Sequence, residues 1–71
     1  MSHAIKSNMP AKVLAVHVKK GDSVSANTVV VTLESMKMEM PVEAGVSGTV
    51  SSVSAVENAT LKKDDVLVVI D

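Results

Sequence analysis

The chain has 71 residues, of which 46% are hydrophobic and none is aromatic, and its net charge is −1. This length allows one domain, so residues 1–71 are expected to form a single unit. Near-neutral charge without Arg argues against nucleic-acid binding, the lack of Cys excludes disulfides, and no apolar run approaches the roughly 18 residues of a membrane span.

The first eight residues contain no apolar stretch of the length found in secretion signals, so a cytoplasmic location is expected. We assign His3 to a disordered tail. His17, the other histidine, lies in a Val-rich segment and is interpreted as strand surface. Two isolated histidines without Cys do not make a zinc site, and no metal is predicted.

The chain repeats itself after 37 residues, because residues 11–34 align without a gap with residues 48–71. Turn residues coincide as well: Gly21 lies over Asn58, and these two residue types best tolerate a positive φ. Agreement of core and turn positions indicates an internal duplication. The coinciding apolar positions are Val13 with Val50, Val16 with Val53, Val29 with Val66, Val31 with Val68 and Leu33 with Ile70.

Each copy is predicted to form a strand, a turn and a second strand. In the second strand, Val29, Val31 and Leu33 alternate with the residues between them, and residues 66–70 repeat the pattern. A period of two predicts a sheet with one buried face, on which these alternating residues lie.

The first strand of each copy is less regular. Its valines lie three residues apart, at residues 13 and 16 and again at residues 50 and 53, which predicts a bend or bulge. Two β units without a helical layer must bury their apolar faces against each other. We therefore predict an all-β fold, a small flattened β-sandwich or barrel of two halves related by a pseudo-twofold axis.

The seam between the copies, residues 35–40, has three interpretations. It is a short helix ended by Pro41, a segment whose methionines fill the core, or a hairpin tip with Lys37 at its apex. A helix of about eight residues is marginal unless it docks on something. The tip, however, carries no Gly or Asn of the kind favoured in tight hairpin turns. Composition alone leaves the three alternatives open.

The hexapeptide Glu34-Ser35-Met36-Lys37-Met38-Glu39 resembles the biotinylation motif of the biotinyl/lipoyl attachment domain family, in which a lysine lies between two methionines. The chain resembles in particular the stand-alone members of the biotin carboxyl carrier type. Residues 7–13 are similar to the Met-Pro-Gly entry of the family. Residues 21–24 match its Gly-Asp-x-Val turn, and residues 41–50 resemble its segment leading into the second half.

The chain departs from the family at a few positions. Ala11 replaces the usual Gly, and Ser35 replaces the more frequent Ala. Asn27, Asn58 and Asp64 stand where the family often has Gly. Asn and Asp are the best non-Gly residues for positive φ, so these changes concern local stability more than the fold.

The resemblance implies a barrel-sandwich hybrid fold, with Lys37 on the hairpin that joins the two halves. It also implies that a biotin protein ligase attaches biotin to the Lys37 amine as an amide. The biotin would carry carboxylate between a biotin carboxylase and a carboxyltransferase, so the chain is expected to be a carrier, not an enzyme, and a monomer in isolation. The residues expected to be recognised by the ligase are Glu34, Ser35, Met36, Met38 and Glu39, although the two glutamates are also interpretable as polar surface.

Two alternatives remain. Lipoate, alone or besides biotin, is an alternative group on the same Lys37. Lipoyl domains commonly have Asp before the lysine and Ala after it, whereas Met36 and Met38 flank it here, which favours biotin. The second alternative is an unmodified β-sandwich interaction module, in which the two methionines form a hydrophobic binding patch. A catalytic centre is least favoured, because the sequence offers no nucleophile and base set.

Overall fold

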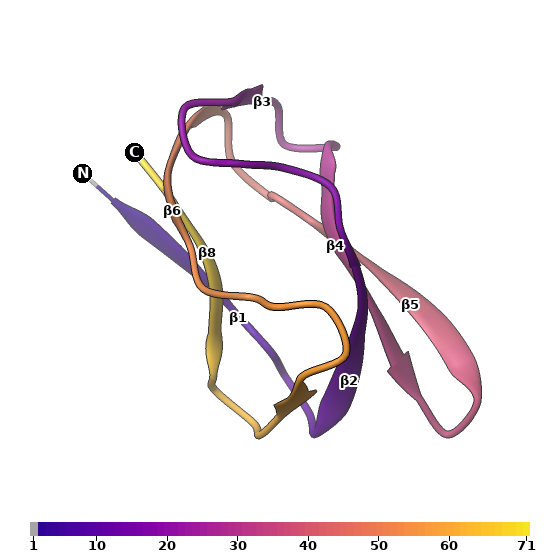
Figure 1. Cartoon of the computed structure of the whole chain (residues 1–71). Helices are drawn as coiled ribbons and strands as arrows, with labels where there is room; N and C mark the ends of the chain where they lie inside the picture. The colour runs from indigo at the N-terminus through magenta and orange to yellow at the C-terminus, as the bar shows by residue number, and fades with distance from the viewer. Residues whose placement is uncertain (1) are drawn as a thin grey trace.

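Short runs of β-branched residues separated by turn residues give an all-β architecture (Figure 1). The computed structural model describes residues 2–71. They form two four-stranded antiparallel sheets, ordered β1-β8-β6-β3 and β5-β4-β2-β7, as the predicted fold class requires. The strands are β1 (His3–Lys6), β2 (Ala11–Val16), β3 (Ser23–Val24), β4 (Val29–Ser35), β5 (Met38–Glu43), β6 (Gly48–Val53), β7 (Thr60–Leu61) and β8 (Val66–Ile70).

Within residues 2–71, no helix is long and apolar enough to cross a membrane.

The two sheets are related by a pseudo-twofold exchange, because β1 to β4 in one half correspond to β5 to β8 in the other. The backbone hydrogen bonds between the halves are reciprocal. The Gly21 amide donates to the Val50 carbonyl at 2.8 Å, and the Asn58 amide donates to the Val13 carbonyl at 2.8 Å. Each turn of one half is thus hydrogen-bonded to the first strand of the other half. The predicted turn equivalence is confirmed, since φ is 96° at Gly21 and 70° at Asn58.

The assignment of His3 to a disordered tail is wrong. His3 pairs with Ile70 at the start of the β1 and β8 ladder, and Ile5 in the same strand is buried in the core. β1 covers the outer edge of β8 in the way that β5 covers β4, so the correspondence of the halves continues to residues 3–6 and 40–43. A four-residue strand with one buried apolar side chain leaves too short a pattern to be recognised in the sequence.

The bulges predicted in the first strands are confirmed. The register of β2 against β4 shifts between Val13 and Ala15, and that of β6 against β8 shifts at the equivalent place, between Val50 and Ser52. An extra residue at these points bends the strand and changes the face to which the next side chain points.

The alternation predicted for the second strands is wrong at the first residues of β4 and β8. β4 shifts register against β5 between Val29 and Val31, and β8 does the same against β1. As a result Val30 and Leu67, which strict alternation would turn outward, are fully buried, while Val29 and Val66 are half-buried. Beyond the bulge the alternation is as predicted, with Leu33 and its equivalent Ile70 in the core.

The core between the sheets is entirely aliphatic. Its largest fully buried apolar side chains come from both halves: Leu33, Leu67, Ile70, Val13, Val30, Val31, Val50 and Val68. Such stiff, branched side chains pack densely without an aromatic anchor. The core fixes the strand register and hence the position of each turn.

Gly48 lies where β6 closely approaches the end of β8, and a substitution at this residue tests that packing. A Cβ at Gly48 would clash with the Asp71 carbonyl oxygen and lie 2.8 Å from Cγ2 of Ile70. We expect Gly48→Ala to lower the free energy of unfolding by about 1–3 kcal/mol, because the backbone must move to admit the methyl group. The neighbouring, exposed Ser47→Ala is the control and should change it by less than about 0.5 kcal/mol. Equal urea midpoints for the two variants would contradict this packing.

Candidate functional site

The hairpin of β4 and β5 has a two-residue turn, Met36 and Lys37. Ser35 pairs with Met38 at the end of the ladder, and Leu33 pairs with Met40 further down. The φ angles of the two turn residues are 54° and 65°. Positive φ at both central positions is the requirement of a type I′ turn, whose twist matches that of the flanking strands. Of the three interpretations of the seam, the hairpin tip is therefore the structure.

The other two interpretations are wrong for physical reasons. A helix is excluded because the residues on both sides of the turn pair in an antiparallel ladder. Core filling is excluded for Met36 and Met38, which are 91% and 68% exposed. Met40 alone of the three seam methionines packs against the core, where it lies half-buried.

The turn stores backbone strain at the lysine. Left-handed backbone costs an ordinary L-residue about 1–2 kcal/mol. Among residues 2–71, the other non-Gly residues with positive φ are Asn58 and Asp64, whose short polar side chains suit it. Met36 and Lys37 lack the short polar side chains that favour this conformation. Strain of this kind is concentrated at functional sites, where the side chain itself is needed.

The ladder directs Lys37 outward. Lys37 is exposed at the end of a hairpin whose strand β4 is anchored in the core through Val31 and Leu33. Figure 1 shows this turn at the tip of the β4 and β5 hairpin, away from the paired ends of the chain. The lysine thus combines a fixed Cα position with a freely rotating amine.

The two glutamates of the motif face each other across the ladder, because Glu34 pairs with Glu39. Like charges directly opposite each other destabilise a sheet. Lys12 lies on the other side of Glu34 as its partner in β2, so one positive charge offsets the pair. Glu39 is exposed and Glu34 is half-buried, and together they place negative charge beside the base of the turn.

The six motif residues are therefore brought together in one hairpin: Glu34 and Ser35 end β4, Met36 and Lys37 form the turn, and Met38 and Glu39 begin β5. His17 lies outside this site. It follows the last residue of β2, and its Nε2 is 2.8 Å from the Thr32 hydroxyl oxygen. Recognition of the motif residues by a ligase stays a prediction.

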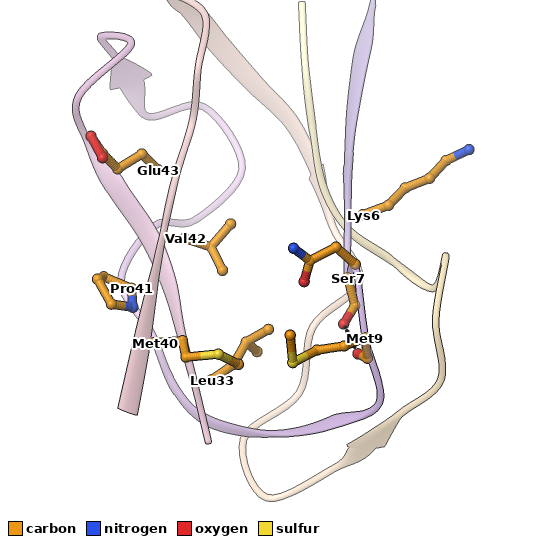
Figure 2. A pocket seen from close by; sticks show the side chains of 9 residues that line it. Lys6, Ser7, Met9, Leu33, Met40, Pro41, Val42 and Glu43 are labelled. Atoms are coloured by element: carbon orange, nitrogen blue, oxygen red, sulfur yellow. Dashed lines mark hydrogen bonds between the residues drawn. The ribbon is translucent and has the colours of Figure 1, made fainter. Parts of the chain in front are cut away.

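A pocket of about 390 Å³ lies beside the hairpin and was not predicted from the sequence (Figure 2). It lies between the segment that connects β1 to β2 and the strand β5. The sulfur-bearing ends of Met9 and Met40 face each other across it in Figure 2, near Leu33. The sequence offers two methionines here, a residue type that fills irregular gaps, but it does not show that they are half-buried or that they lie close together.

Residues 3–70 match the biotin/lipoyl family, described as "Biotin-requiring enzyme". The chain belongs to the biotin/lipoyl attachment domain family. It is 43% identical over 70 residues to the "biotinylated protein TB7.3 homolog" of Mycobacterium leprae, a match that covers 99% of each chain. It is 38% identical over 69 residues to a biotin carboxyl carrier protein of Streptococcus mutans, covering 97% of this chain and 53% of that protein.

Among solved structures, the attachment domain resembles part of the urea carboxylase of Kluyveromyces lactis. The TM-score is 0.91 with 27% sequence identity, and the match covers all of this chain and 6% of that one. As an attachment domain, the chain is a carrier and not a catalyst.

The strain in the turn is testable by replacing Met36. We expect Met36→Asn to raise the free energy of unfolding by about 1 kcal/mol, because Asn tolerates the left-handed conformation. The same change at Met38, which is also exposed but lies in β5, should leave stability equal or lower, because Asn disfavours strands. Lys37→Arg should change it by less than about 0.5 kcal/mol. A loss of stability in Met36→Asn, measured by urea unfolding, would argue against positive φ at this residue.

Proposed function

We propose that the Lys37 amine of this attachment domain is the site of covalent biotin attachment and that the domain acts as a biotin carboxyl carrier. The observation that carries the proposal is an exposed lysine on a strained two-residue turn between Met36 and Met38, which are themselves largely exposed. An exposed primary amine fits the carboxyl end of biotin, since the two join as an amide.

The attachment step requires a partner enzyme. The neutral Lys37 nitrogen attacks the acyl carbon of an activated biotin, the carbon–nitrogen bond forms, the activating group leaves and the nitrogen loses a proton. The nearest acidic residues in the hairpin, Glu34 and Glu39, lie on strands rather than in the turn. A biotin protein ligase is therefore proposed to supply the activation and to accept the proton, while the domain supplies the position of the amine.

The proposed carrier role depends on tethering. Bound biotin supplies a ureido nitrogen that accepts and delivers carboxylate. The domain keeps it on a flexible side chain, so it meets a biotin carboxylase and a carboxyltransferase at high effective concentration without release. The likeness to a segment of urea carboxylase supports partners of this class. A net charge of −1 suits a module that contacts several partners and leaves each of them.

The proposal is tested by incubating the purified chain with biotin protein ligase, biotin and ATP. We expect the intact mass to rise by one biotinyl group and peptide mapping to place it on Lys37. Lys37→Arg should take none, whereas Lys63→Arg, an exposed lysine in a distant turn, should be labelled fully. Labelling of Lys37→Arg, or labelling by a lipoyl ligase alone, would refute biotin attachment at this lysine.

Recognition by the ligase is expected to use the two exposed methionines. We expect Met36→Gln and Met38→Gln each to lower kcat/KM of biotinylation about tenfold, which corresponds to losing part of the burial energy of one methionine. Val56→Gln is the matched control, because Val56 is 65% exposed but lies outside the hairpin. Unchanged kcat/KM in both methionine variants would show that the ligase does not depend on them.

A further inference from the structure

We propose that the pocket beside the hairpin is a docking site for the biotin ring carried by Lys37 of the same chain. This inference rests on the function proposed above. The pocket of about 390 Å³ falls within the range of about 300–1,000 Å³ typical of small-molecule sites. The lining residues that bear on this docking are Lys6, Asn8, Met9, Leu33, Met40 and Glu43.

The pocket is continuous with the hairpin that carries the lysine. Two of its lining residues, Leu33 and Met40, pair across the ladder only two pairs below Ser35 and Met38, which flank the turn. A strand rises about 3.4 Å per residue, so Met40 lies about 10 Å along β5 from Lys37. A lysine side chain with the acyl chain of biotin extends on the order of 13 Å at standard bond lengths. The ring therefore reaches the pocket when the arm folds back along β5.

The lining matches the two sides of the ring. Biotin has an apolar thioether side, and the half-buried Met9 and Met40 offer it an adaptable apolar surface over the buried Leu33 (Figure 2). The ureido side has two N–H donors and one carbonyl acceptor. The Asn8 amide, which also lines the pocket, both accepts and donates hydrogen bonds. Lys6 and Glu43 provide flexible charged groups at the rim, where Figure 2 shows both side chains pointing outward.

The duplication supplies an internal comparison. The segment Asn8 and Met9 corresponds to Gly45 and Val46 in the second half. In the first half, this segment places the amide of Asn8 and the long thioether of Met9 beside β5. At the equivalent place in the second half, Gly45 has no side chain and Val46 has a shorter, apolar one. The fold alone does not require Met9, and Val46 serves as its matched control.

Methionine methyl groups report on the docking. In the chain labelled with ¹³C at its methionine methyls, Met9 and Met40 report on the pocket, while Met36 and Met38 report on the turn. After biotinylation, verified by mass, we expect the Met9 and Met40 signals to shift, to the same extent at every protein concentration. In Met9→Ala the Met40 shift should fall by at least half, and in Val46→Ala it should persist.

Each other outcome overturns the proposal. Shifts confined to Met36 and Met38 in a fully biotinylated chain would mean that the arm extends into solvent, and would leave the carrier function intact. Shifts that grow with protein concentration would mean that the arm docks on another copy. Equal loss of the Met40 shift in Met9→Ala and Val46→Ala would mean that the pocket side chains do not bind the ring. A chain that accepts no biotin overturns both the docking and the proposed function.

Discussion

The register of β4 against β5 leaves two residues to reverse the chain, and the position of Lys37 depends on that register. It is held by the core, where Leu33 and Val31 are buried on one side of the ladder and pair with Met40 and Val42. A slip by one residue would turn Glu34 into the aliphatic core and Leu33 into solvent. The core therefore places the lysine, although Lys37 itself is exposed.

The same constraint explains why strain is tolerated in the turn. Asn-Gly would form this reversal at lower cost, yet the chain has Met36 and Lys37 with positive φ. The cost is small beside the burial energy of the ladder below it. Proline is tolerated in β5 because β5 is an edge strand, so the missing amide of Pro41 need not break a central ladder. The hairpin of β4 and β5 thus departs from the local preferences that the rest of the chain follows.

Much of the fold was accessible from the sequence, because the duplication repeats both its apolar period and its turn residues. The bulges in the first strands follow from the spacing of Val13 and Val16. The bulge that buries Val30 was missed, since a continuous run of valines carries no sign of which residue is the extra one. β1 was missed because Ile5 is its single buried residue.

The site was accessible only in part. Residue types at the turn argue against a tight hairpin, and the resemblance of Met36-Lys37-Met38 to a known motif decided among the alternatives. The pocket was not accessible, because it joins Met9 to Met40, two residues whose proximity depends on the packing of one half against the other. In the duplicated fold, the place equivalent to the hairpin is where β1 and β8 pair, and Figure 1 shows both ends of the chain there.

The most direct test of this account is the backbone conformation of the turn in solution. An intraresidue amide-to-Hα nuclear Overhauser effect is strong when φ is positive, because the two protons are then close together. We expect effects at Met36 and Lys37 as strong as those at Asn58 and Asp64, and weak effects at the strand residues Glu34 and Glu39. Weak effects at both turn residues would mean that Lys37 is not held on this strained two-residue turn.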